Sequence, residues 1–349
     1  MELVNQTPLP AKVTVTRLSD TERGGIITAK ATFCFSPGET ALDTQAPFPL
    51  SLEPVVTELG LLPPDLPYQV ADERFEVVVL GCAHAPSQEP VTEMRVAVSV
   101  GDVRRELVVT GDRSWAVHDG HTMMSSPVPF SRMPLTWERA FGGRCKIEVD
   151  DGAFVVVADP INPAGRGYDV ARDAQAQAEY LEAPPGFPRY EYERLLPNLE
   201  RPDERVATPE DRPRPACWAT RPIDSGLRAE PLLQGMPDRV ATAVEAGRVE
   251  SAVRVLRSAC DEWVIDRPPA AAAVTLEGLA PGGAVSFPLP QLSVHADYSA
   301  SNRRGTVTLR PQRLVLLPEE QRLMLTYRAM FRVPYVASEE RSLRLRLGG

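Results

Sequence analysis

The chain has 349 residues, of which 43% are apolar and 24% charged, and these values are typical of a globular protein and not of a disordered one. A formal net charge of −9 argues against a dedicated nucleic-acid binder, which needs a basic face to contact phosphates. Five scattered cysteines, no signal segment and no apolar stretch near the roughly 20 residues of a membrane span favour a cytoplasmic protein. We therefore expect neither nucleic acid nor a membrane as a partner.

The first 160 residues contain short runs in which apolar and polar positions alternate, as half-buried strands do. Strands are predicted at 12–17, 26–35, 75–80, 94–100, 104–109 and 153–158. Gly24-Gly25 and Gly101-Asp102 are predicted to be hairpin turns. This half of the chain is predicted to be a set of antiparallel hairpins.

The middle of the chain is irregular, because residues 161–238 are rich in proline and charge. A helix is predicted over 239–260, where Val249, Ala252, Val253 and Leu256 recur at intervals of three and four. Strands are predicted to resume at 273–276, 284–289, 292–296, 305–310, 313–317, 321–329 and 341–347, with turns at 281–283 and 318–320.

These elements predict a mainly β fold, an antiparallel sandwich or barrel-like assembly with long proline-rich loops and one substantial helix. The whole chain, 1–349, is expected to form one unit. Within it, two β subdomains (1–160 and 265–349) are a possible division, joined by the loop region 161–238 and the helix 239–260.

The signatures of common enzymes are absent: there is no nucleophile elbow, no phosphate loop and no zinc-binding His-Glu-x-x-His. Cys82, His84, His118 and His121 are potential zinc ligands, but their spacing matches no known zinc pattern. We predict no catalytic, metal or cofactor site. The alternative is a hydrolase with a cleft near His118, His121 and Glu138.

The densest run of unusual residues is 127–144. Residues 137–141 read Trp-Glu-Arg-Ala-Phe, and Gly142-Gly143 follow, where a positive φ carries no Cβ penalty. A short helical turn is predicted just after Pro134. Within it Trp137 and Phe141 are expected to pack, and Glu138 and Arg139 to satisfy each other or nearby backbone.

A second unusual run, Asp112, Arg113 and Trp115, follows a predicted strand directly. The favoured interpretation is a tight turn in which Asp112 caps backbone amides and Trp115 packs into the core. A recognition loop is the first alternative, because exposed Trp and Arg are frequent anchors at interfaces. The second is a carbohydrate- or surface-binding β module that uses Trp115 and Trp137.

Several motifs taken together resemble a known family. In chain order they are Leu3-Val4-Asn5-Gln6-Thr7-Pro8, Gly111-Asp112-Arg113 with Trp115, Pro134-Leu135-x-Trp137-Glu138-Arg139-Ala140-Phe141-Gly142-Gly143, Asn162-Pro163-x-Gly165-x-Gly167, Leu196-Pro197-Asn198-Leu199-Glu200, Trp218 with Arg221, and Ala296-Asp297-Tyr298. In this order they resemble the bacterial family named domain of unknown function 2169 over nearly the whole chain.

The resemblance implies a role in type VI secretion. Members are similar to adaptors or chaperones that help load a secreted effector protein onto the spike, which consists of a trimeric spike protein and its cap protein. It therefore implies a cytoplasmic, non-enzymatic binding protein without a cofactor. The chain departs from the family pattern over 222–268, so its choice of partner is expected to differ there.

The resemblance also selects candidate structural or interaction residues. They are Asp112, Arg113, Trp115, Trp137, Glu138, Arg139, Phe141, Gly142, Gly143, Asn162, Asn198, Glu200 and Trp218. Because the run 127–144 is interpreted as an internal brace, the partner surface itself is expected in the loops of 160–237 and the helix that follows.

Overall fold

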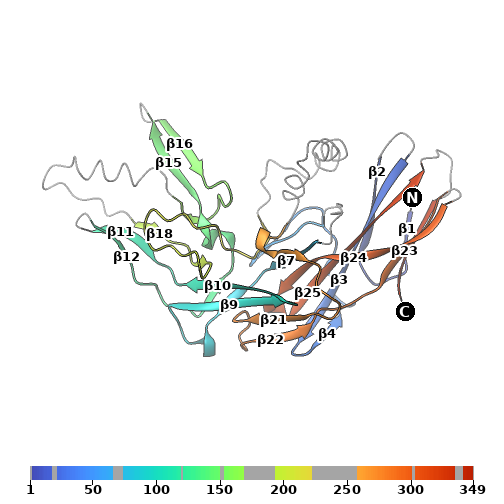
Figure 1. The fold of residues 1–349 in the computed structure, drawn as a ribbon, viewed down its shortest axis with the longest axis horizontal. Coiled ribbons are helices and arrows are strands. Elements are labelled where there is room, and N and C mark those ends of the chain that lie inside the picture. The colour runs from blue at the N-terminus through green and yellow to red at the C-terminus, as the bar shows by residue number, and fades with distance from the viewer. Residues whose placement is uncertain are drawn as a thin grey trace.

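A computed structural model describes residues 2–17, 22–65, 74–118, 121–149, 153–168, 193–221, 258–300, 303–334 and 341–348. These ranges contain strands, loops and three-residue 3-10 helices but no α-helix. The 3-10 helices are η1 (Pro86–Gln88), η2 (Trp137–Arg139), η4 (Asp261–Trp263) and η5 (Pro318–Glu320). The molecule is elongated, with both termini at one end and several small sheets at the other (Figure 1). The predicted mainly β fold is confirmed.

The largest sheet has ten strands and carries the two termini. Its main path is β1 (Glu2–Asn5), β26 (Arg341–Leu347), β23 (Val294–Ala300), β24 (Arg303–Leu317), β25 (Arg322–Pro334), β3 (Glu22–Ser36) and β2 (Ala11–Arg17), and β4 (Glu39–Leu42), β7 (Arg74–Val79) and β20 (Val264–Asp266) join beside it. β1 and β2 end the path on opposite sides, yet only residues 6–10 connect them. Because so short a link spans little distance, the sheet curls into a half-barrel. We call it the curled sheet.

Pairing in the curled sheet is antiparallel except between β1 and β26 and between β7 and β24. β24 pairs with β23 along its first half and with β25 along its second, and a bulge follows Pro311. The strands predicted at 305–310 and 313–317 are therefore one strand, because the bulge accommodates the proline.

The predicted hairpin turn at Gly24-Gly25 is wrong, because both glycines lie inside β3. Their partners in the register are Arg332 and Phe331 of β25. A Cβ on Gly25 would lie 2.1 Å from the ring of Phe331, which also stacks on Tyr298 with centroids 5.6 Å apart. The glycine thus makes room for a distant aromatic ring and does not reverse the chain.

The other sheets are smaller. One has five strands in the order β19 (Leu199–Glu200), β10 (Val103–Thr110), β9 (Glu93–Val100), β21 (Ala273–Glu277) and β22 (Val285–Pro288), and another has three, β12 (His121–Met124), β11 (Ser114–His118) and β18 (Glu193–Leu195). The two-stranded pairs are β13 (Arg132–Pro134) with β8 (Cys82–His84), β14 (Phe141–Gly142) with β17 (Arg166–Gly167), β15 (Arg144–Val149) with β16 (Ala153–Ala158), and β5 (Val55–Thr57) with β6 (Gly60–Leu62).

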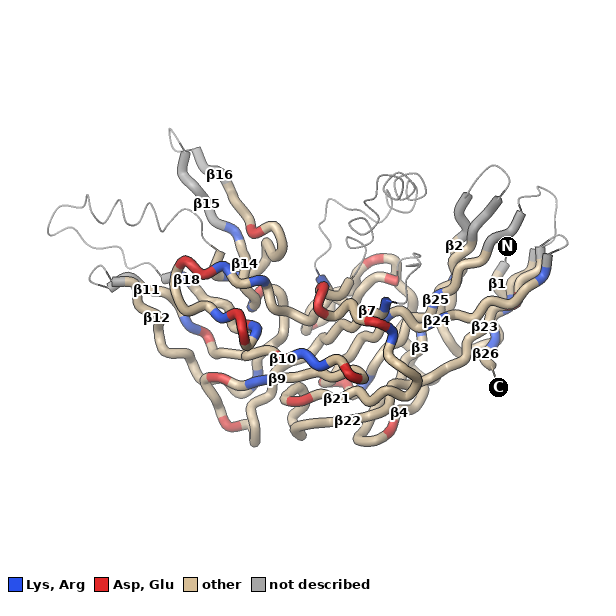
Figure 2. Tube along the Cα trace, in the orientation of Figure 1, with Lys and Arg blue, Asp and Glu red and all other residues tan. Residues whose placement is uncertain are grey.

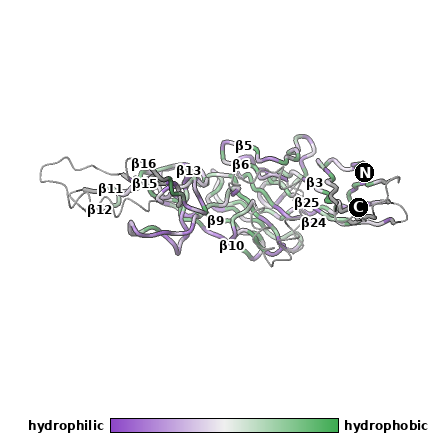
Figure 3. Tube along the Cα trace, turned by 90° about the horizontal axis from the view of Figure 1, so that it is seen from above, coloured by the Kyte–Doolittle hydropathy of each residue, from purple (hydrophilic) through white to green (hydrophobic). Residues whose placement is uncertain are grey.

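Two hydrophobic clusters hold the sheets together. The larger one joins the curled sheet to the five-stranded sheet and contains Trp218 and Trp263, whose rings meet edge to face with centroids 5.9 Å apart. The smaller one contains Trp115, Phe141, Leu196 and Val206. Seen from above, the molecule is narrow, and β11, β12, β15 and β16 lie at the end away from the termini (Figure 3).

The helix predicted over 239–260 is not confirmed. Residues 239–257 lie outside the described residues, and 258–260 are not helical. The ranges 1–160 and 265–349 share sheets, since β3 pairs with β25 and β9 with β21. In the part of the chain that the structure describes, no helix is long and apolar enough to cross a membrane.

Candidate functional site

Four of the family-like motifs converge on one polar cluster, which we call the hub: Asp112, Arg139, Arg166 and Asn198. Oδ1 of Asp112 accepts hydrogen bonds from Nδ2 of Asn198 at 3.0 Å, from Nη1 of Arg166 at 3.2 Å and from Nη1 of Arg139 at 3.3 Å. Partial burial alone would raise the pKa of Asp112, but the Asn198 amide and the two guanidinium groups lower it. One carboxylate therefore ties three distant segments together.

Asn198 is fully buried, and its hydrogen bonds connect segments that no strand pairing joins. Its backbone N–H donates to the carbonyl of Arg139 at 2.8 Å, and its Nδ2 donates to the carbonyl of Thr110 at 2.9 Å. Its Oδ1 accepts from Nη1 of Arg139 at 3.0 Å. The side chain thus joins the end of β10 to the turn at 137–139.

Asn162 braces the same turn from its other side. Its Nδ2 donates to the carbonyls of Trp137 at 2.8 Å and Phe141 at 2.9 Å, and its own carbonyl accepts from the N–H of Gly143 at 2.8 Å. A Cβ on Gly142 would lie 2.2 Å from the Asn162 oxygen, and φ is 140° at Gly142 and 118° at Gly143. Both glycines are needed here for conformation and for space.

The turn itself is the 3-10 helix η2, and Pro134 precedes it in β13. Trp137 is buried and donates from Nε1 to the carbonyl of Ala219 at 3.1 Å. Of the two arrangements expected for Glu138 and Arg139, an ion pair between them is not observed, because Arg139 engages Asp112 and Glu138 is exposed. Adjacent residues of a 3-10 turn point in different directions, so neighbours in sequence do not meet.

A buried ion pair lies next to the hub. Nη2 of Arg113 is 2.5 Å from Oε2 of Glu200, and both residues are less than 9% exposed. Oε1 of Glu200 accepts from the N–H of Val206 at 2.7 Å. Arg205 extends the network, with Nε 3.5 Å from Glu200 and Nη2 2.6 Å from Glu93. Basic and acidic residues interleave throughout this region (Figure 2).

The remaining candidate aromatics are internal. Trp115 and Phe141 pack in the smaller hydrophobic cluster, and Trp218 donates from Nε1 to Oε1 of Glu262 at 3.1 Å. Trp115 and Trp137 are buried, so neither presents a ring to a sugar. The packing interpretation of Trp115 therefore holds over the recognition-loop alternative. The expectation that Asp112 caps backbone amides is wrong for the described residues, because its carboxylate accepts from the side chains of Asn198, Arg139 and Arg166.

The groups considered for catalysis or metal binding are dispersed. His118 pairs with His121 across the β11–β12 hairpin, whereas Cys82 and His84 lie on β8. Nε2 of His84 is 2.7 Å from Oε1 of Glu319, and burial, together with the Glu319 carboxylate, raises the pKa of the Cys82 thiol to about 12. Within the described ranges, no group of three or more His, Cys, Asp and Glu is arranged to hold a metal.

Sequence reasoning missed two arginines of this network, Arg166 and Arg205. Arg166 lies between two glycines of a family-like motif, which was the available signal. Arg205 lies outside the motifs, and its closer partner, Glu93, is 112 residues away.

The region around the hub also presents apolar side chains to solvent. We call residues 111–118, 121–149, 153–168 and 193–206 the motif lobe. It carries five of the nine large hydrophobic residues that are exposed in the described chain: Met123, Val128, Val156, Ile161 and Leu195. Met123 is 59% exposed on β12 and Leu195 is 49% exposed on β18, and these are the two outer strands of the three-stranded sheet.

Met123 and Leu195 lie on the same face of that sheet. Met123 pairs with Ala116, and Leu195 pairs with Ser114. Ala116 and Ser114 are two residues apart on β11 and therefore project from the same side. The opposite face carries Trp115 and belongs to the smaller core cluster.

A family model described as "Uncharacterized protein conserved in bacteria (DUF2169)" matches residues 20–328. This range covers most of the 349 residues, so the chain belongs to that family. No curated protein and no solved structure matches the chain.

Proposed function

We propose that this member of the DUF2169 family is a non-enzymatic adaptor or chaperone that binds a type VI secretion effector and helps load it onto the spike. The spike partner is the trimeric spike protein or its cap protein. The type VI role follows from the motif resemblance. The observation that carries the binding role is the outer face of the motif lobe, where exposed apolar side chains lie on strands with open edges.

Open strand edges accept partner strands. In the described chain, β12 and β18 have no neighbouring strand on their outer sides. A partner strand added there would gain backbone hydrogen bonds, and its alternate side chains would contact Met123 or Leu195. Natural sheets usually protect such edges with charge, proline or a covering element. Two exposed hydrophobic residues on open edges favour a surface that is covered in a complex.

The interior of the motif lobe supports binding and not turnover. Asp112, Arg139 and Asn198 are engaged with one another, and Arg113 is paired with Glu200. Groups satisfied in this way stiffen the lobe, and a stiff surface loses less entropy on association. Outside the lobe, on β8, the Cys82 thiol has a raised pKa, so it stays protonated near neutral pH and is a poor nucleophile.

Affinity purification of the tagged protein from its native host tests the proposal. Mass spectrometry should identify a spike component or a secreted toxin as the co-purifying protein. The double variant Met123→Asp, Leu195→Asp should reduce that recovery by at least about tenfold, because charges at the centre of an interface are costly. Its thermal stability should change little, since both side chains are exposed.

Val56→Asp is the matched control. Val56 is 80% exposed but lies on β5, outside the motif lobe, so this variant should recover the partner normally. Repeated recovery of the protein alone would refute the adaptor role. Normal recovery by the double variant would refute the motif lobe as the binding surface.

A further inference from the structure

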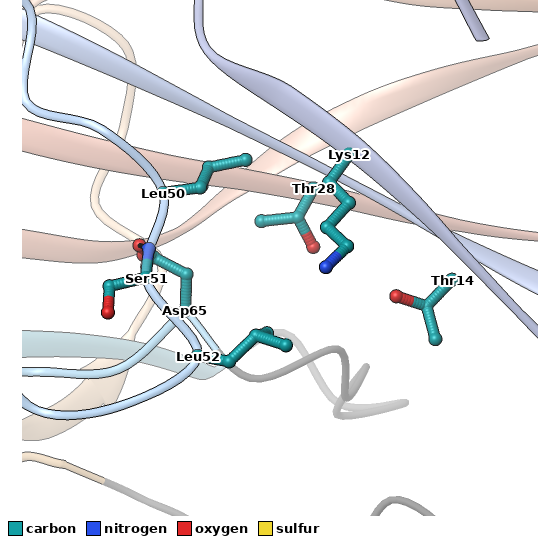
Figure 4. Close-up of a pocket in the computed structure, with 7 residues that line it drawn as sticks. All are labelled: Lys12, Thr14, Thr28, Leu50, Ser51, Leu52 and Asp65. Atoms are coloured by element: carbon teal, nitrogen blue, oxygen red, sulfur yellow. Dashed lines mark hydrogen bonds between the residues drawn. The ribbon is translucent and has the colours of Figure 1, made fainter.

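A small pocket lies beside the edge of the curled sheet, far along the chain from the hub. Its volume is about 40 Å³, and it is lined by Lys12, Thr14, Thr28, Leu50, Ser51, Leu52 and Asp65 (Figure 4). Lys12 and Thr14 come from β2, and Thr28 is the register partner of Lys12 on β3. Leu50, Ser51 and Leu52 come from the segment between β4 and β5, and Asp65 follows β6. The pocket thus has a polar wall of strands and a partly apolar wall of loop.

The polar wall holds groups without partners. Thr28 is only 4% exposed, and its hydroxyl is buried without a hydrogen bond. Lys12 is exposed, and within the described residues no hydrogen bond or ion pair engages its ammonium group. In Figure 4 the Lys12 ammonium and the Thr14 and Thr28 hydroxyls point toward one another. A buried hydroxyl without a partner is costly, so a ligand that pairs with it is favoured.

The charge around the pocket favours an anion. The Asp65 carboxylate forms an ion pair with Lys30 and also accepts from the N–H of Ser51 at 3.1 Å and the hydroxyl of Thr326 at 3.3 Å. Its charge is therefore compensated within the sheet, and no residue that the structure describes provides a counter-ion for Lys12. Burial lowers the pKa of Lys30, Asp65 opposes this, and the charges of Arg313 and Arg328 add to the lowering; Arg313 is itself 3.4 Å from the Glu76 carboxylate.

We propose that this pocket binds a carboxylate group, which accepts hydrogen bonds from Nζ of Lys12 and from the hydroxyls of Thr14 and Thr28. Leu50 and Leu52 contact the carbon that carries the carboxylate. The volume fits a group of this size and is far below the roughly 300 Å³ at which pockets for larger small molecules begin. The ligand is either a small free carboxylate or an acidic side chain of a bound polypeptide.

Methyl NMR of the full chain, with labelled threonine, tests the site and separates the two sources. The probes are acetate, N-acetyl-aspartate N-methylamide and its neutral asparagine analogue. Both carboxylates should shift the Thr14 and Thr28 methyl signals in a saturable manner, and the asparagine analogue should not. Tighter binding of the blocked aspartate, by threefold or more, assigns the site to a polypeptide side chain. Equal or tighter binding of acetate assigns it to a free carboxylate.

Thr28→Val and Lys12→Gln should each weaken carboxylate binding by about tenfold, as expected for loss of one charge-assisted hydrogen bond. The Thr14 methyl reports binding in both variants. Thr28→Val should leave the thermal stability unchanged or raise it, because the hydroxyl has no partner in the free protein. A merely structural role for Thr28 would produce no change in binding.

Thr32→Val is the control. Thr32 lies on the same strand as Thr28, and its hydroxyl already accepts a hydrogen bond from the N–H of Phe48 at 3.0 Å. That variant should lose stability and bind carboxylates like the parent. Equal shifts with the asparagine analogue, or with sodium chloride at the same ionic strength, would overturn the proposal. Parent-like affinity of Thr28→Val and Lys12→Gln would overturn it as well.

Discussion

The motif lobe and the curled sheet satisfy their backbone groups in different ways. In the curled sheet every one of the 13 residues of β25 has a partner on β3, so the strand ladder itself provides the hydrogen bonds. In the motif lobe β14 pairs with β17 over two residues, and β19 pairs over two residues with β10, which lies next to the lobe. Side chains complete the pairing there: Asn162 and Asn198 each donate to two acceptors in segments remote in sequence.

This difference explains why several of the recognisable motifs lie in the motif lobe. A long strand ladder requires only that apolar and polar residues alternate, and many sequences meet that condition. A short ladder leaves N–H and C=O groups that must find specific amides, carboxylates or glycines. The Glu-Arg-Ala-Phe-Gly-Gly run and the two asparagine motifs lie where such groups are concentrated. We therefore expect single substitutions to be more costly in the motif lobe than in the curled sheet.

Glu200→Ala should produce the largest loss of stability. It leaves the Arg113 guanidinium buried without its carboxylate, and breaking a buried pair in this way costs about 3–5 kcal/mol. Urea unfolding of the full chain measures the loss. The double variant Arg113→Met, Glu200→Leu should recover much of it, because no unpaired charge remains. A loss below about 1 kcal/mol for Glu200→Ala would contradict the view that the lobe depends on this pair.

Gly142→Ala should come next and has a matched control in the curled sheet. Its φ is 140° and its Cβ would meet the Asn162 oxygen at 2.2 Å, whereas Gly38, with φ 81°, has open space around its Cβ position. Backbone strain alone costs about 1–3 kcal/mol at either site. Only Gly142→Ala adds a clash, so its unfolding midpoint should fall clearly further than that of Gly38→Ala. Equal losses would remove the distinction between the two regions.

The same contrast decides what the sequence could predict. The longer strands of the curled sheet were predicted from the sequence pattern, whereas the short strands β1, β4 and β20 were not, and the turns at 281–283 and 318–320 follow from proline and glycine. Contacts between remote segments do not leave a local pattern. Arg113 and Glu200 are 87 residues apart, and Asp112 and Arg166 are 54 apart.

Two errors arose from local reasoning about remote contacts. Gly25 looks like a turn residue in sequence, but its small size serves the ring of Phe331. Glu138 and Arg139 were expected to interact because they are adjacent, but Arg139 forms an ion pair with Asp112. Gly142, Asn162 and Asn198 make close contacts or buried hydrogen bonds, as expected where glycine and asparagine in irregular segments indicate special backbone geometry.

Asp112→Asn should have a smaller effect that depends on pH. The folded-state pKa of Asp112 is lowered, so its ion pairs add stability above the unfolded value near 3.9, and this contribution is lost as the pH falls through the folded value. Its side chain is 50% exposed, which limits the contribution to below about 1 kcal/mol. Urea midpoints of parent and variant should differ near pH 7 and converge near pH 2–3. A difference that is the same at both pH values would show that Asp112 acts without its charge.

Glu138→Ala should have the smallest effect, within about 0.5 kcal/mol, because Glu138 is exposed although it lies in the most distinctive motif of the chain. This separates the two reasons for which a residue can belong to a motif. Arg139 and Gly142 are explained by the interior of the lobe, whereas the Glu138 side chain has no hydrogen-bond or ion-pair partner within the described residues. Partner recovery by Glu138→Ala at unchanged thermal stability is therefore informative. A clear loss of recovery would extend the binding surface to η2, and normal recovery would confine it to β12 and β18.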